Sequence, residues 1–109
     1  MPERDALLGR LDIVCYYRAG RSVFFIFRHG SYSVAVTVDL STVRRADGDD
    51  WFEARSEFQV RPITPLTATW SSDQSVTGYG KTEEEAMLAA VDLFTDRFDT
   101  GFRTGRVPP

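Results

Sequence analysis

Apolar and polar positions along the first 80 residues fall into short apolar segments of the length of β-strands, separated by polar turns. Segments 11–18, 23–28 and 32–38 are rich in β-branched and aromatic residues, and short turns at 19–22 and 29–31 separate them. Strands joined by such short turns pair as antiparallel neighbours. The pattern therefore predicts a three-stranded antiparallel meander at the start of the domain.

The middle of the chain predicts further strands after a polar loop. We expect that loop over 39–50, where Asp47-Gly48-Asp49-Asp50 is the clearest turn signal. Residues 51–61 alternate between apolar and charged positions, which is typical of a strand with one solvated face. Segments 66–70 and 75–79 predict a last hairpin that turns at 71–74.

After residue 81 the period changes to that of an amphipathic helix. Thr82 and Glu85 form a capping box, in which each side chain hydrogen-bonds a backbone N–H near the helix start. The apolar stripe recurs at intervals of three and four residues and comprises Met87, Ala90, Val91, Phe94 and Phe98. We expect Gly78 and Gly80 to turn the chain from strand to helix, and Gly101 to end the helix.

Several strands followed by one helix predict an α+β fold. We expect an antiparallel β-meander of about five to six strands, with one C-terminal amphipathic helix packed on one face. A chain of 109 residues is long enough to build its own core. We expect residues 1–99 to form a single domain and residues 100–109 to form a flexible tail.

The first two strands are apolar on both sides, which creates a packing imbalance. A helix of about 17 residues is about 25 Å long and covers only one face of a sheet. The second face needs cover from the N-terminal segment, from sheet curvature or from another chain, because large exposed apolar patches mark interaction sites. We expect Tyr16, Phe24 and Ile26 on that face, in contact with another protein or with a second copy.

Charge adds a second candidate surface. The net charge is −3 and the isoelectric point is near 5.1. The helix carries an acidic face that could meet a basic partner and steer its association, formed by Glu84, Asp92, Asp96 and Asp99. Trp51 begins its strand on the polar side, so we add it as a candidate interface residue.

Arginines at the hairpin ends and in the long loop support an alternative function. The candidate nucleic-acid contacts are Arg18, Arg21, Arg28, Arg44 and Arg45. Nucleic-acid binding without sequence preference depends on a strong basic footprint, and this chain is acidic overall. A nucleic-acid-binding regulator is therefore the alternative to a protein-binding function.

Catalytic groups are sparse in this sequence. His29 is the only histidine and Cys15 the only cysteine, and no spacing indicates a third residue that would orient them. We expect Cys15 to be buried in its strand and inert. We therefore predict no enzymatic activity and no small-molecule substrate.

Metal and cofactor motifs are incomplete as well. Asp47, Asp49 and Asp50 lack the 12-residue ligand pattern of a calcium loop. Gly80-Lys81-Thr82 matches the end of a phosphate-binding loop, but Ser75 stands where the first glycine is needed. We predict no metal site and no cofactor. One cysteine excludes an intrachain disulfide, and no apolar run is long enough to cross a membrane, so we expect a cytoplasmic protein.

One segment resembles known families. Residues 76–86, V-T-G-Y-G-K-T-E-E-E-A, followed by Ala89-Ala90, resemble the strand–Gly–Thr–x–x–Glu–Ala–helix segment of HicB-type antitoxins. They are also similar to the closing strand and helix of double-stranded-RNA-binding domains, but three glutamates follow Lys81 where those domains carry a basic cluster. The resemblance covers about 20 of 109 residues.

The leading hypothesis is a small, acidic, non-catalytic binding protein that acts by protein–protein contact. Inhibitors, immunity proteins and antitoxins, including those encoded by phages and mobile elements, are typical proteins of this size and charge.

Overall fold

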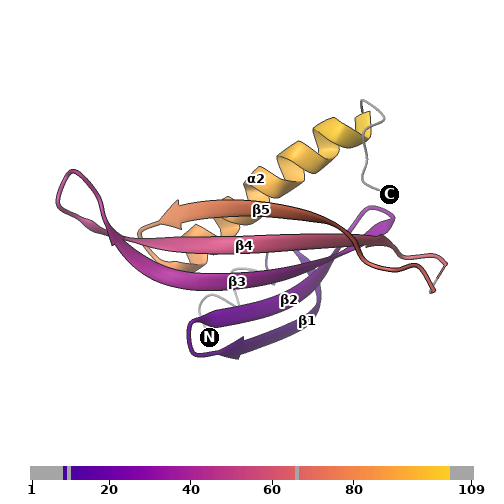
Figure 1. Ribbon diagram of the computed structural model, residues 1–109, viewed down its shortest axis with the longest axis horizontal. Helices are drawn as coiled ribbons and strands as arrows, with labels where there is room; N and C mark the ends of the chain where they lie inside the picture. Colours follow the sequence, from indigo (N-terminus) through magenta and orange to yellow (C-terminus); the bar gives the residue numbers. More distant parts are fainter. Residues whose placement is uncertain (1–8, 10, 66, 104–109) are drawn as a thin grey trace.

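Five antiparallel strands form one open sheet, and one C-terminal helix packs on it (Figure 1). The computed structural model describes residues 9, 11–65 and 67–103, without the side chains of 71–73 and 99–103. The elements are β1 (Asp12–Ala19), β2 (Ser22–His29), β3 (Tyr32–Arg44), β4 (Asp50–Pro62), β5 (Ser71–Gly80) and α2 (Glu83–Arg103). The strand order is β1-β2-β3-β4-β5, so the predicted α+β meander is confirmed.

The hydrophobic core lies between α2 and one face of the sheet, which we call the inner face. Every second residue is buried there over 23–27 of β2, 34–40 of β3 and 54–60 of β4, as expected for strands with one face against the core. Phe58 of β4 and Phe94 of α2 stack with ring centroids 4.2 Å apart. The buried apolar stripe of α2 comprises Ala86, Met87, Ala90, Val91, Phe94 and Phe98, and α2 packs chiefly on β5 and β4.

The hairpin of β3 and β4 is longer than the sequence predicts. The two strands pair along all 13 residues of each, from Tyr32 opposite Pro62 to Arg44 opposite Asp50. The expected loop over 39–50 is therefore wrong for 39–44, and the turn is confined to 45–49. Asp39 and Ser41 lie on the solvated face of β3, where polar side chains need no burial, while Leu40 reaches the core.

The expected last hairpin does not form. Residues 71–80 make one strand that runs along β4, with Gln74 opposite Phe58 and Gly80 opposite Phe52. The chain turns earlier, in the irregular connection after Pro62, because proline has no N–H to donate to a sheet. The sheet thus has five strands, at the lower end of the predicted number.

Helix α2 starts at the predicted capping box and ends later than predicted. The Thr82 hydroxyl accepts a hydrogen bond from the Glu85 N–H at 3.2 Å, and the Glu85 carboxylate accepts one from the Lys81 N–H at 3.0 Å. The helix continues through Gly101 to Arg103. A glycine inside a helix costs about 1 kcal/mol and does not by itself stop it. The predicted tail thus begins with helical residues, and 104–109 lie outside the described residues.

Gly78 and Gly80 act as contact points for the helix and not as the turn that we expected. Both belong to β5 and face α2. A Cβ atom on Gly78 would overlap the carbonyl oxygen of Ala86 and the backbone nitrogen of Ala90. A Cβ on Gly80 would lie 2.6 Å from the backbone nitrogen of Ala86. Only glycine permits this separation, because the atoms in the way are helix backbone and have no room to move.

We expect Gly78→Ala to destabilise the domain by about 3 kcal/mol, because the added methyl group forces α2 away from the sheet. Urea unfolding followed by circular dichroism measures this change. Thr77→Ala is the matched control on the opposite face of the same strand, and its cost should stay below about 1 kcal/mol. Equal effects of the two substitutions would contradict the close-contact role of Gly78.

Candidate protein-binding face

The face of the sheet opposite α2 is the outer face, and it is divided into two halves. One row across all five strands shows the division, since the paired residues along it are Tyr17, Phe24, Thr37, Glu57 and Ser75. The row is aromatic on β1 and β2 and polar from β3 to β5. The outer face therefore joins an apolar half to a polar half.

The apolar half is a contiguous set of side chains on β1, β2 and β3. We call it the apolar patch, and it comprises Val14, Cys15, Tyr17, Phe24, Ile26 and Ala35. The side chains at the β1 edge are well exposed, with 63% of Tyr17 and 54% of Val14 accessible to solvent. Phe24 and Ile26 are half-buried beside them. The predicted second apolar face therefore exists and carries exposed side chains.

A β-bulge in β1 decides which residues belong to this patch. Ile13 pairs with Phe27 and Cys15 with Ile26, which leaves Val14 as an extra residue. Beyond the bulge, Tyr16 faces the inner side and packs against the core, and Tyr17 faces outward. The expectation that Tyr16 shares a face with Phe24 and Ile26 is therefore wrong, and Tyr17 takes its place.

The sequence carries no signal for this bulge. A strand that is apolar on both sides accepts either register, because the hydrophobic pattern does not distinguish its two faces. The same shift exposes Cys15, which we expected to be buried.

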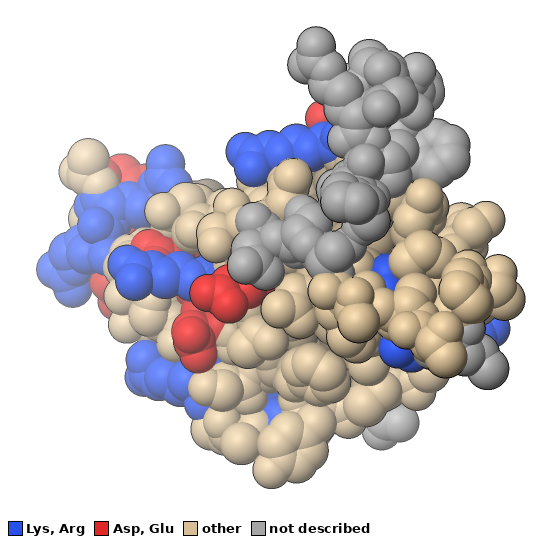
Figure 2. Space-filling model, turned by 45° about the vertical axis from the view of Figure 1, so that its right-hand side comes forward, with Lys and Arg blue, Asp and Glu red and all other residues tan. Residues whose placement is uncertain are grey.

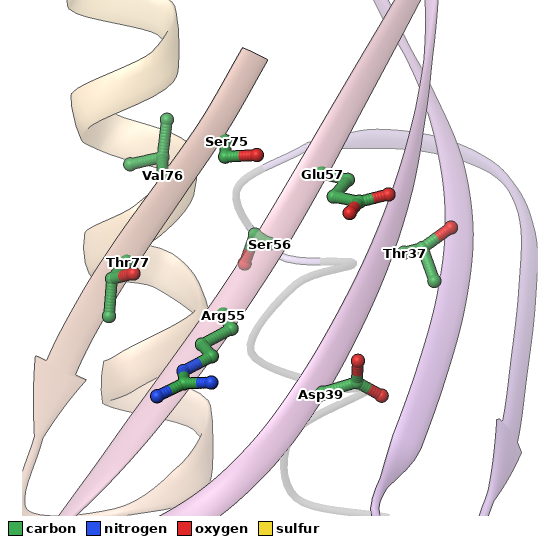
Figure 3. Close-up of a pocket in the computed structure, with 8 residues that line it drawn as sticks. All are labelled: Thr37, Asp39, Arg55, Ser56, Glu57, Ser75, Val76 and Thr77. Atoms are coloured by element: carbon green, nitrogen blue, oxygen red, sulfur yellow. The ribbon is translucent and has the colours of Figure 1, made fainter. Parts of the chain in front are cut away.

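The polar half contains a shallow depression of about 340 Å³ (Figure 3). Its lining comes from β3, β4 and β5 and comprises Thr37, Asp39, Arg55, Ser56, Glu57, Ser75, Val76 and Thr77. Arg55 donates from Nε to the carboxylate of the buried Glu53 at 2.6 Å. The depression thus offers hydroxyl groups and charges of both signs, which suit hydrogen bonds to a partner surface.

Trp51 lies on the outer face but far from the apolar patch. It pairs with Val43, eight residues along β3 from Ala35. The Arg45 guanidinium lies 4.6 Å and the Lys81 ammonium 5.0 Å from its ring centroid. Lys81 also contacts Asp49 at 2.9 Å. Trp51 therefore joins the β3–β4 turn to the start of α2, and the structure does not bring it together with Phe24 and Ile26.

The predicted acidic helix face lies on a different side of the molecule from the apolar patch. Asp92 and Asp96 are exposed on α2 and line a groove beside β5, whereas Glu84 is half-buried. The side chain of Asp99 lies outside the described residues. The two surfaces predicted from the sequence therefore lie apart in the fold.

The arginines of the nucleic-acid alternative do not gather on one face. Arg18 donates to both carboxylate oxygens of Glu83, at 3.1 and 3.2 Å. Arg44 pairs with Asp50 at 3.3 Å, and Arg45 lies over the ring of Trp51. Arg21 and Arg28 are exposed near opposite ends of β2. Figure 2 shows basic side chains standing beside acidic ones at one end of the molecule.

The two candidate catalytic side chains are separated by the sheet. His29 is half-buried on the inner side, with its ring edge-on to Phe98 at 5.6 Å, while Cys15 is exposed on the outer face. No group of three or more His, Cys, Asp or Glu residues in the described part of the chain is placed to hold a metal ion. No helix there combines the length and apolar composition needed to cross a membrane.

No protein-family model matches the chain, and neither a curated protein nor a solved structure is significantly similar to it. The resemblance to HicB-type antitoxins and to RNA-binding domains thus gains no support from these comparisons.

We expect deletion of Val14 to be tolerated, because it removes the extra residue and leaves Ile13, Cys15, Tyr16 and Tyr17 on their present faces. Thermal unfolding should show a midpoint within a few degrees of the parent protein, as for a change of about 1 kcal/mol. Deletion of Tyr17 is the control. It removes a residue from a regularly paired part of the strand, so neighbouring side chains move to the opposite face of the sheet. Equal damage from both deletions would contradict the assignment of the bulge.

Proposed function

We propose that this chain is a small, non-catalytic binding protein that docks onto another protein through the apolar patch of its outer face. The observation that carries the proposal is the exposure of Tyr17 and Val14 in continuity with Phe24 and Ile26, on the face opposite α2. An apolar centre beside a polar margin is the usual anatomy of a protein interface.

The energetics of docking favour this surface. Burying an apolar side chain of this size contributes about 1.5–3 kcal/mol. Tyrosine is common among residues that dominate binding energy, because it combines a large apolar area with a polar tip. The charges of the polar half, Asp39, Arg55 and Glu57, would select a partner with complementary charges and reject others.

This mode of action requires contact alone and no bound cofactor, as in inhibitors, immunity proteins and antitoxins. A cytoplasmic location remains our prediction, since a single exposed thiol suits a reducing compartment. Nucleic-acid binding has less support, because three of its five candidate arginines contact acidic or aromatic side chains of the domain itself.

Cys15 provides a natural probe of the patch, because it is the only cysteine of the chain and lies beside Ile26. We expect its thiol to react with Ellman's reagent within about ten-fold of the rate in the unfolded protein, since it is solvent-exposed. The rate should not change when the protein is diluted.

A thiol protected at every dilution would show that the chain covers its own patch, which would overturn the proposal. Protection that grows with concentration, with a doubled mass by light scattering, would assign the patch to a second copy.

A protein partner that docks on the apolar patch should slow the labelling of Cys15 when it binds. Tyr17→Ser should weaken that binding by at least about ten-fold, as expected for an exposed aromatic at an interface centre. Leu93→Ser is the control outside the patch, because Leu93 is also an exposed large hydrophobic residue, 45% accessible against 63% for Tyr17, and lies on another side of the molecule. A partner that leaves Cys15 fully reactive and binds the Tyr17→Ser variant with unchanged affinity would rule out the patch as its docking site.

A further inference from the structure

The two edges of the sheet differ in how well they are protected against pairing with a further strand. The β1 edge carries a bulge at Val14 and charged residues at Asp12 and Arg18, which are devices that prevent further strand pairing. The β5 edge has neither over 74–80, where it pairs with β4 in unbroken register and contains no charged residue and no proline. Among the described residues, β5 pairs with β4 alone.

A groove runs beside this unprotected edge, between β5 and α2. Its volume is about 540 Å³, and it is lined by Thr77, Gly78, Tyr79, Ala89, Asp92, Leu93 and Asp96. Gly78 and Ala89 have no side chain or a small one, so they leave space in the groove. Tyr79 and Leu93 beside it are 46% and 45% exposed. The helix residues follow the spacing i, i+3, i+4 and i+7, so they share one face of α2.

This combination matches the way in which proteins capture extended peptides. A peptide strand that pairs with an open sheet edge gains backbone hydrogen bonds, and every second side chain enters the neighbouring groove. We propose that the groove between β5 and α2 binds an extended segment of another protein, in which basic and small apolar residues alternate. The segment would add a sixth strand to the sheet. This site is separate from the apolar patch and does not depend on the function proposed for it.

The charge of the groove defines the chemistry of the segment. Asp92 and Asp96 stand one helical turn apart and are both exposed on the α2 wall. Residues 74–80 of β5 provide no positive charge opposite them. Every second side chain of the segment would face α2, where lysines or arginines would reach the two carboxylates and their aliphatic stems would contact Ala89 and Leu93. The alternating apolar side chains would face the other way, on the side of Tyr79.

The same charges argue against a second copy as the occupant. Pairing of β5 with β5 of another copy would bring two sets of Asp92 and Asp96 to one interface. No residue between Ser71 and Gly80 is basic, so the strand would supply no counter-charge. Like charges placed together at an interface cost free energy, and a basic segment avoids this cost.

The test uses short fluorescent peptides and the full chain. A peptide that alternates lysine and valine should bind at least about ten-fold more tightly than one that alternates glutamate and valine, because only the former complements the aspartates. Methylating alternate backbone nitrogens of the lysine–valine peptide should reduce its affinity by about ten-fold, since it removes the donors of the added strand. Hydrogen exchange of alternate amides within 74–80 should slow when the peptide binds.

Two double variants distinguish binding in the groove from nonspecific attraction of a basic peptide to an acidic protein. Asp92→Asn combined with Asp96→Asn should weaken the lysine–valine peptide by about ten-fold, the loss expected for two exposed ion pairs. Asp47→Asn combined with Asp50→Asn makes the same change of charge at the β3–β4 turn and should leave the affinity unchanged. The peptide should also leave the labelling rate of Cys15 unchanged, so the two proposals fail independently.

Three results would overturn the proposal. The first is that the lysine–valine peptide shows no measurable binding. The second is that substituting Asp47 and Asp50 weakens binding as much as substituting Asp92 and Asp96. The third is a dimer that forms a disulfide after Cys15→Ser and Ser75→Cys, which would assign the edge to a second copy.

Discussion

The close approach of α2 to β5 is the constraint on which the rest of this structure depends. Because Gly78 and Gly80 carry no side chains, the backbone around Ala86 and Ala90 lies directly against the strand. At this separation Phe94 stacks on Phe58 and the apolar stripe of the helix fills the core. The glycines thus fix the position of the helix over the β5 side of the sheet.

Placing the only described long helix on one side has consequences for both candidate surfaces. The outer face receives no cover from α2, and Val14 and Tyr17 of its apolar patch are exposed. On the other side, the helix lies beside the β5 edge and brings two aspartates next to an unprotected strand. The position of one helix therefore leaves an apolar patch on one side of the sheet and an acidic groove beside its β5 edge.

The start of α2 is also where distant parts of the chain meet. Arg18 of β1 contacts Glu83, and Asp49 of the β3–β4 turn contacts Lys81, which also lies over Trp51. Residues that looked like candidates for binding, such as Arg18 and Trp51, are used here to join elements of the domain. Their charges and aromatic area were visible in the sequence, but Glu83 lies 65 positions from Arg18 along the chain and Lys81 lies 30 positions from Trp51.

Local signals determined the elements that the sequence predicted well. The alternation of 51–61, the short turns after the first two strands and the capping box at Thr82 all act between near neighbours, and the structure contains each of them. The existence of a second apolar face that α2 does not cover also followed from the sequence, because one helix covers one face of a sheet.

Tertiary structure decided the rest. The bulge at Val14, the extension of β3 to Arg44 and the strand role of Gly78 depend on what lies across the sheet or against the helix. A strand that is apolar on both sides fits either register, and glycine suits a turn as well as a close contact. Pairing and packing between distant residues choose between such alternatives, and that choice placed Tyr17 in the apolar patch and Tyr16 against the core.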